Sequence, residues 1–341
     1  MYSNEKKINK LFLHWLIISL IMVFFIIIVG GLTRLTGSGL SITEWELVYG
    51  ILPPLNKESW IYYFNLYKQI PQYKLLNSNM TLNEFKIIFY WEYFHRILGR
   101  IIGLFFLIPL IYFYFSKKIK SEYINICYVV FILILLQGFL GWYMVKSGLV
   151  NEVTVSHYRL SIHLTMAFLI ISTIFWLIKN INSNKNKVFF NFKVNNYPYQ
   201  ILILLIFFQI ILGAFVSGLD AGRIYQTWPL MGENYFPNDF DIDKFQKIFD
   251  FNNHSLVQFY HRNLAYIIVF YAIFLSIFIY LKKVNNLYKP LQIFLFFLIL
   301  QAILGILTLI TGLNIYLASV HQFTSVLLIL SAINLYYFKT N

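Results

Sequence analysis

Four histidines occupy repeating places in otherwise apolar stretches of the chain: His95, His163, His261 and His321. A buried imidazole needs a polar partner or a metal, and an ionisable residue inside a membrane segment usually has a function. Two imidazoles from facing helices can take both axial positions of one haem iron, because the porphyrin supplies four further nitrogens. We therefore predict two haem sites, with His95 and His163 at one iron and His261 and His321 at the other.

Zinc or copper is the competing metal for such histidines. Zinc sites usually have three or four protein ligands, and two histidines without a cysteine or a nearby carboxylate pair are few for that ion. Cys127 is the only cysteine, so the chain has neither an internal disulfide nor a cysteine-based metal site. The remaining histidines, His14, His157 and His254, are expected not to be ligands.

Arginines accompany the predicted ligands, and the planar guanidinium is suited to pairing with carboxylates such as the two haem propionates. Arg96 and Arg262 each follow a histidine directly, and Arg159 precedes His163 by four residues. The alternative is an interfacial arginine without a particular partner. For Arg100 this alternative fits as well as propionate pairing does, whereas it fits Arg96 and Arg262 less well because they occupy the same place in both halves.

Glu92 distinguishes the two predicted haem sites. It precedes His95 by three residues and so shares its helical face, whereas the matching position before His261 is Gln258. A carboxylate beside one haem can relay protons or stabilise a developing cation. The alternative is an ordinary interfacial ion pair with Arg96.

The chain as a whole is too apolar for a soluble protein. Its 341 residues are 59% hydrophobic and 12% charged, where soluble domains carry about 25% charged residues. A helix needs about 20 apolar residues to cross a hydrocarbon core of roughly 30 Å. Eight such runs predict an all-α membrane protein with eight transmembrane helices, near 11–31, 93–115, 123–146, 157–178, 199–219, 256–281, 291–312 and 316–338. The first run is too long for a removable signal peptide and no cleavage site follows it.

The distribution of charge predicts orientation in the membrane. The net charge is +13, but the lysines and arginines are spread over short loops, which does not favour nucleic acid as a partner. Lysines gather before the first run and in the loops at 117–120, 179–193 and 282–289. The positive-inside rule then places both termini in the cytoplasm and the long loops 32–92 and 220–255 outside the inner (cytoplasmic) membrane.

The two halves of the chain form an internal repeat. VGGLTRLTGSGL (29–40) matches LGAFVSGLDAGR (212–223), EYFHRILGR (92–100) matches QFYHRNLAY (258–266), and QGFLGWYMVKSGL (137–149) matches QAILGILTLITGL (301–313). Each repeat has an even number of spans, so both copies enter the membrane in the same direction. We predict two pseudo-twofold-related four-helix bundles, as domains 1–180 and 195–341. Within the first outer loop, residues 56–77 predict an interfacial helix and turn, and Thr81 to Glu84 has the spacing of a capping box that begins a helix.

Several longer motifs resemble the haem A synthases of the alphaproteobacterial and mitochondrial kind. They are TRLTGSGLSITEW (33–45), FKIIFYWEYFHRILGR (85–100), VSHYRLSIHL (155–164), GLDAGRIYQTWPLM (218–231), LVQFYHRN (256–263) and ASVHQFT (318–324). The resemblance runs along nearly the whole chain in order. Some relatives carry a cysteine pair in an outer loop, which this chain lacks, and His157 stands where another residue is expected.

This resemblance implies an enzyme with two haem sites. The second bundle would hold a haem b cofactor on His261 and His321, with Arg262 beside it. The first would bind substrate haem O at His95 and His163, with Arg96 and Arg159 nearby and Glu92 as the catalytic residue. The reaction implied is oxidation of the C8 methyl group of haem O to the formyl group of haem A for cytochrome oxidase. Expected partners are a haem O synthase, an electron donor, membrane lipid and a second copy of the chain.

Two other functions fit part of the pattern. A di-haem b-type cytochrome that oxidises quinol explains the four histidines equally well, but not the difference between Glu92 and Gln258. A transporter would also show parallel repeats, but it leaves the paired histidines and arginines unexplained.

Overall fold

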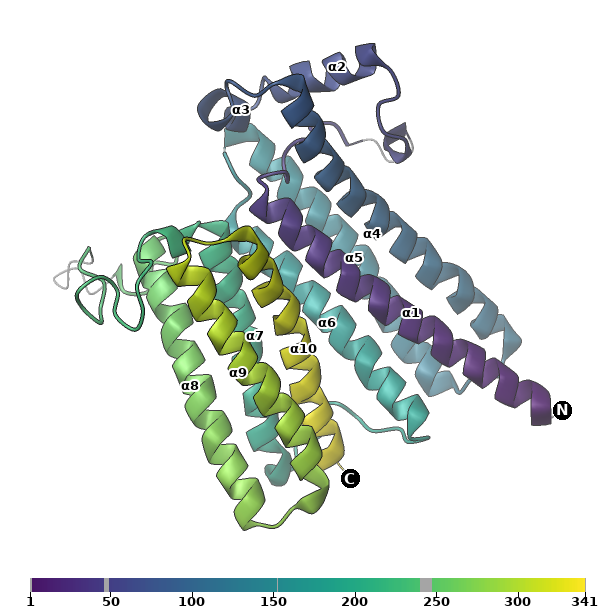
Figure 1. The fold of residues 1–341 in the computed structure, drawn as a ribbon. Helices are drawn as coiled ribbons and strands as arrows, with labels where there is room; N and C mark the ends of the chain where they lie inside the picture. The colour runs from purple at the N-terminus through teal and green to yellow at the C-terminus, as the bar shows by residue number, and fades with distance from the viewer. Residues whose placement is uncertain (1, 46–48, 152, 240–246, 341) are drawn as a thin grey trace. The chain divides into compact units, whose positions relative to one another are not determined.

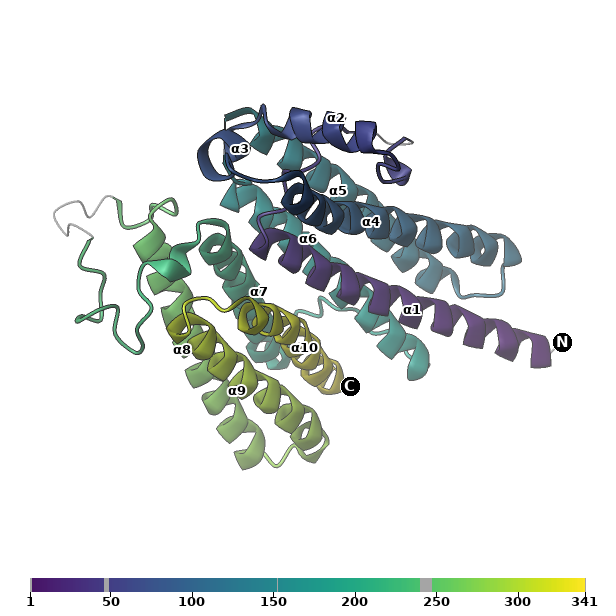
Figure 2. The same cartoon turned by 45° about the horizontal axis from the view of Figure 1, so that its top comes forward.

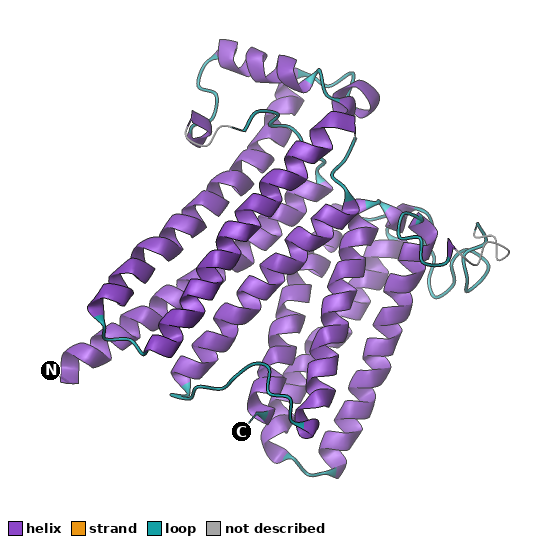
Figure 3. Ribbon diagram, turned by 180° about the vertical axis from the view of Figure 1, so that it is seen from behind, coloured by secondary structure: helices purple, strands orange, loops and turns teal. Residues whose placement is uncertain are grey.

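The computed structural model describes residues 2–45, 49–151, 153–239 and 247–340, and these residues form helices and connecting loops (Figure 3). Parts of both predicted outer loops, 46–48 and 240–246, lie outside the described residues. Among the described residues eight helices are long and apolar enough to cross a membrane, which confirms the predicted all-α membrane fold. Their bounds are α1 Tyr2–Leu35, α4 Leu82–Ser116, α5 Ser121–Asn151, α6 His157–Asn182, α7 Tyr197–Gly218, α8 His254–Leu281, α9 Tyr288–Ile310 and α10 Ile315–Lys339.

The chain divides into two compact units, residues 1–178 and 179–341. In the first unit α1 packs against α4, and α4 packs against α5, with α6 completing the set (Figure 1). In the second unit α7 packs against α8 and α10, and α9 packs against α10. Each unit thus contains four long helices and one predicted histidine pair. The assignment of separate roles to domains 1–180 and 195–341 stays a prediction.

A proline inside α4 is accommodated by a side chain from α1. Pro109 has no N–H group, so the carbonyl of Phe105 one turn earlier loses its helical donor. The indole of Trp15 donates to that carbonyl at 3.0 Å. In lipid an unsatisfied backbone group costs several kcal/mol, so the contact fixes how α1 lies against α4.

Two shorter helices, α2 (Lys57–Tyr67) and α3 (Pro71–Leu76), lie at the end of the first unit that is distant from the N-terminus (Figure 2). Asn56 caps α2 by accepting from the backbone N–H of Ser59 at 2.8 Å. Thr81 and Glu84 form the predicted capping box, and α4 begins at Leu82 as expected. The predicted helix and turn at 56–77 is therefore confirmed as two helices.

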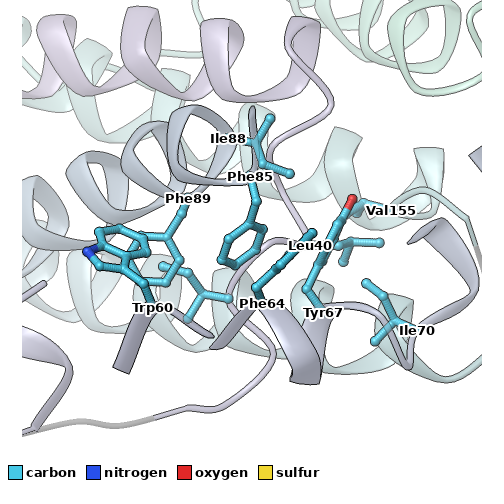
Figure 4. Packing of buried hydrophobic residues seen from close by; sticks show 10 residues of the cluster. Leu40, Trp60, Phe64, Tyr67, Ile70, Phe85, Ile88, Phe89 and Val155 are labelled. Atoms are coloured by element: carbon cyan, nitrogen blue, oxygen red, sulfur yellow. The ribbon is translucent and has the colours of Figure 1, made fainter. Parts of the chain in front are cut away.

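An aromatic cluster joins α2 to the first turns of α4 (Figure 4). Trp60 lies 5.1 Å from Phe89 between ring centroids, and Phe64 lies 5.0 Å from Phe85. Leu40, from the loop after α1, is buried in the same cluster. Because each buried aromatic side chain contributes a large apolar area, this packing fixes the loop at residues 38–42 over the N-terminal end of α4.

Candidate functional site

The first unit brings His95 of α4 and His163 of α6 face to face. Their ring centroids lie 6.4 Å apart and the ring planes are inclined by 71°. Two metal–nitrogen bonds of about 2.0 Å each would account for about 4 Å of that separation. The remaining 2.4 Å (6.4 − 4.0) is about twice the distance from a ring centre to a ring nitrogen. The spacing would therefore allow His95 and His163 to hold one metal ion between them.

The second unit contains the matching pair, His261 on α8 and His321 on α10. Both helices pack against α7, and each ring faces a glycine of a neighbouring helix. The structure thus brings the first pair into contact and places the members of the second pair on two helices of one bundle; their joint binding of a haem stays a prediction.

A glycine on a neighbouring helix faces each of the four rings. A Cβ atom added at these glycines would lie 2.9 to 3.1 Å from the ring Cε1 atom, a separation that side chains do not tolerate without movement. The pairs are Gly30 with His95, Gly141 with His163, Gly213 with His261, and Gly305 with His321. Glycine thus makes room for each ring on the helix that precedes the histidine.

The four imidazoles fit haem better than a structural metal ion. In each ring Nδ1 is buried and has no hydrogen-bond partner, as expected where a bound group completes the site. Within the described ranges no three side chains among His, Cys, Asp and Glu gather as a metal site would need. Two nitrogens per pair are too few for zinc and are sufficient for haem.

Glu92 is buried beneath the outer loop of the first unit, with 2% of its surface exposed. Its Oε2 atom accepts from the Ser41 hydroxyl at 2.7 Å and from the backbone N–H of Ile42 at 2.8 Å. Its Oε1 atom accepts from Arg96 at 2.6 Å and 3.1 Å. The ion pair weighed from the sequence is therefore present, but it is buried instead of interfacial. Ser41 and Ile42 were not predicted, although both lie in the motif at 33–45.

The second unit repeats this arrangement without the carboxylate. Gln258 donates to the backbone carbonyl of Tyr225 at 2.8 Å, and Arg262 donates to the carbonyls of Tyr225 and Thr227, each at 2.8 Å. The two units therefore share one arrangement. The residue three positions before His95 or His261, and the arginine directly after that histidine, form hydrogen bonds with the loop that follows the first long helix of the unit. At this position the first unit has the carboxylate of Glu92, and the second unit has the uncharged amide of Gln258.

Among the described residues of the first unit, a cavity of about 230 Å³ lies beside Arg96. Arg96 lies over the Trp45 ring at 4.8 Å, and Lys146 lies over the Trp142 ring at 5.1 Å. Trp142 directly follows Gly141, which faces the ring of His163. Arg96 of α4 and Lys146 of α5 therefore border a cavity, and α4 also carries His95.

The other arginines and histidines considered from the sequence have contacts of their own. Arg159 stacks over the Tyr143 ring at 5.2 Å, and Arg100 donates to the backbone carbonyl of Gly50 at 3.1 Å. His157 packs against its neighbour Tyr158, and His254 is the first residue of α8. His14 contacts the carbonyl of Lys10 within its own helix at 2.6 Å.

Paired imidazoles on facing transmembrane helices place this protein in the class of helical membrane haem proteins. The sequence profile of the cytochrome oxidase assembly protein family matches residues 13–333. The chain is 47% identical to the haem A synthase of Pelagibacter ubique over 100% of both chains. It is 42% identical to that of Rickettsia felis, over 94% of this chain and 96% of the relative, and 40% identical to that of Rickettsia prowazekii, over 98% and 99%. The chain belongs to the haem A synthase family of cytochrome oxidase assembly proteins.

Proposed function

We propose that this chain is a haem A synthase, an oxidoreductase that converts the C8 methyl group of haem O to the formyl group of haem A. The observation that carries this proposal is the pair of imidazoles, His95 and His163, with ring centroids 6.4 Å apart in a unit that also holds the buried carboxylate of Glu92. The similarity to haem A synthases extends over the full chain.

The two units take different haems in this proposal. His261 and His321 would hold a resident haem b, which supplies electron transfer when it is bound. His95 and His163 would hold substrate haem O. The assignment follows from Glu92, because a haem that only passes electrons has no need of a carboxylate, whereas oxidation of a ring methyl benefits from one. Gln258 stands at the matching place in the second unit.

The buried ion pair defines what Glu92 can do. Arg96 and the hydrogen bonds from Ser41 and Ile42 hold both oxygens of the carboxylate in place. A fixed negative charge at this place would stabilise positive charge that develops nearby, and the Ser41 hydroxyl offers a route for a proton to Oε2. Glu92 therefore acts in this proposal as the catalytic carboxylate, and Arg96 orients it.

The propionates of the bound haems would meet the arginines. Arg96 and Lys146 border the cavity of the first unit, and Arg159 lies on the same helix as His163. Arg262 takes the corresponding place in the second unit. We further propose an inner-membrane location with both termini in the cytoplasm, a haem O synthase that supplies the substrate, a separate electron donor, and self-association of the chain.

Expression together with a haem O synthase in cells that lack haem A tests the function. Membranes should contain haem A, identified by its mass after extraction, only when the chain is present. Accumulation of haem O together with haem b bound to the purified chain would instead support an electron-transfer cytochrome. Purified protein without haem absorbance would support a transporter and contradict both haem functions.

A further inference from the structure

The linker between α6 and α7, residues 183–193, is fixed to the second unit by hydrogen bonds. The side-chain amide of Asn180, at the end of α6, donates to the carbonyl of Lys187 at 3.0 Å and accepts from its backbone N–H at 3.2 Å. The carbonyl of Phe189 accepts from the hydroxyl of Tyr336 on α10 at 2.7 Å. The linker is therefore an ordered part of the second unit, and the directions of its side chains are defined.

Apolar side chains of this segment point outward at alternate positions. Four of them, two residues apart, are between 66% and 76% exposed and form what we call the outward row: Val188, Phe190, Phe192 and Val194. The rings of Phe190 and Phe192 are nearly parallel, with centroids 6.1 Å apart. Between them Phe189 faces inward, with its ring 5.7 Å from that of Tyr336. Contiguous exposed apolar side chains mark interaction surfaces, so the outward row is expected to meet a partner.

The charged residues around the outward row are all positive. Lys185 and Lys193 flank the row and are exposed. Three further lysines lie in the loop 282–289 between α8 and α9, at the same end of the helices. Every acidic residue of the second unit lies between positions 220 and 250, in the loop at the opposite end. The partner that suits this surface is therefore both apolar and negatively charged.

Anionic phospholipid meets both requirements. The linker joins two helices that are long and apolar enough to cross a membrane, so it lies at the level of the lipid headgroups. Aromatic side chains are favoured at that depth, and each lysine close to an anionic membrane surface adds about fivefold in affinity. A small free anion could pair with the lysines, but it would leave the outward row in water.

We propose that the linker is a binding site for anionic phospholipid, with the outward row among the acyl chains and Lys185 and Lys193 on the lipid phosphates. The hydrogen bonds at Lys187 and Phe189 hold the linker in shape, so little conformational freedom is lost when lipid binds. The bound lipid in turn holds the linker, and the start of α7 that follows it, at the membrane surface. This site is independent of the haem chemistry and of which side of the membrane the linker faces.

A fluorophore on the outward row reports which lipid lies beside it. The full-length chain carrying Phe192→Cys is labelled with bimane, while the native Cys127 is fully buried and stays unlabelled. The labelled protein is placed in phosphatidylcholine nanodiscs that contain a nitroxide-bearing lipid, either phosphatidylglycerol or phosphatidylcholine. We expect both lipids to quench the fluorophore and phosphatidylglycerol to do so at a much lower mole fraction, because two lysines contribute about fivefold each.

The decisive variants remove the flanking charges one at a time. Lys193→Gln and Lys185→Gln should each lower the preference for phosphatidylglycerol about fivefold. Lys118→Gln is the matched control, because it removes the same charge from the exposed loop between α4 and α5 of the first unit, and it should leave the preference unchanged. Added salt should weaken the preference as well, since exposed charges are screened.

Several results would overturn the proposal. Equal quenching by the two lipids, or an unchanged preference in both lysine variants, would remove the anionic lipid. Quenching by aqueous iodide but by neither lipid would place the outward row in water. Protection from iodide and from both lipids would mean that a protein, such as a second copy of the chain, covers the row. Phe190→Cys gives the same readout if Phe192→Cys does not fold.

Discussion

At the scale of single residues, Glu92 distinguishes the two units, because the matching residue of the second unit is the uncharged Gln258. Its carboxylate is buried, paired with Arg96, and bonded by Ser41 and Ile42. Burying an ion pair costs desolvation energy that is recovered only with good geometry and further hydrogen bonds. The first unit provides both the geometry and the hydrogen bonds. The second unit has the amide of Gln258 at the position of Glu92, so stability alone does not explain the carboxylate.

Replacing Glu92 by Gln should separate catalysis from binding. The amide keeps the shape of the side chain but carries no charge, so we expect haem A formation to fall at least about 100-fold. Haem content per chain and the low-spin spectrum of both haems should remain as in the wild type. The measurement is haem composition of membranes together with the spectrum of the purified variant.

Glu84→Gln is the matched control, because Glu84 is an exposed carboxylate on the same helix that only completes the capping box of α4. Glutamine also serves at this position of a capping box, so the variant should fold as the wild type does and leave haem A formation unchanged. Normal turnover by Glu92→Gln would remove the catalytic role. A loss of haem in that variant would make Glu92 a structural residue.

At the scale of helices, the contact between Trp15 and the carbonyl of Phe105 decides how α1 and α4 pair. Pro109 creates the unsatisfied carbonyl and the indole satisfies it. The two residues are far apart in sequence, and each looks unremarkable in its own segment, since proline is tolerated in transmembrane helices when neighbours supply donors.

A double-mutant cycle between Trp15 and Pro109 tests this pairing. Trp15→Phe should destabilise the protein by about 1 kcal/mol more when Pro109 is present than in Pro109→Ala. In the alanine variant the restored N–H donates to the Phe105 carbonyl, so the indole is no longer needed. Unfolding in mixed micelles titrated with dodecyl sulfate gives the four free energies, and equal effects of Trp15→Phe in both backgrounds would contradict the pairing.

At the scale of the whole molecule, the position of the lysines predicts which ends of the helices face the cytoplasm. The loops at 117–120 and 282–289 lie on the predicted inner side, and α2 and α3 lie on the predicted outer side of the first unit. Figure 1 places α2 and α3 at the end of that unit distant from the N-terminus, as this orientation requires.

The only native cysteine makes this orientation simple to measure. Cys127 is fully buried, so it should give little background with a membrane-impermeant maleimide. Asn79→Cys, in the loop before α4, should be labelled in intact spheroplasts. Lys118→Cys, between α4 and α5, should be labelled only after the membrane is disrupted. The reverse pattern would invert the proposed topology and place the haem sites near the cytoplasm.

The sequence by itself determined the eight spans and the start of α4 after Thr81, and it predicted how the four histidines pair. Hydropathy, capping and helical period are local properties, and the internal repeat supplied the predicted pairing that local patterns lack. The chemistry of Glu92 was left open between catalysis and an ion pair with Arg96, and the structure contains that ion pair in a buried form.

Only the tertiary structure decided which groups meet. The closing of Ser41 and Ile42 over Glu92 and the donation of Trp15 to Phe105 depend on how each helix is rotated about its axis. That rotation is set by packing between segments far apart in the chain, which a pattern within one segment does not specify. The sequence therefore predicted the candidate ligands, and only the packing of the helices decided which side chains surround them.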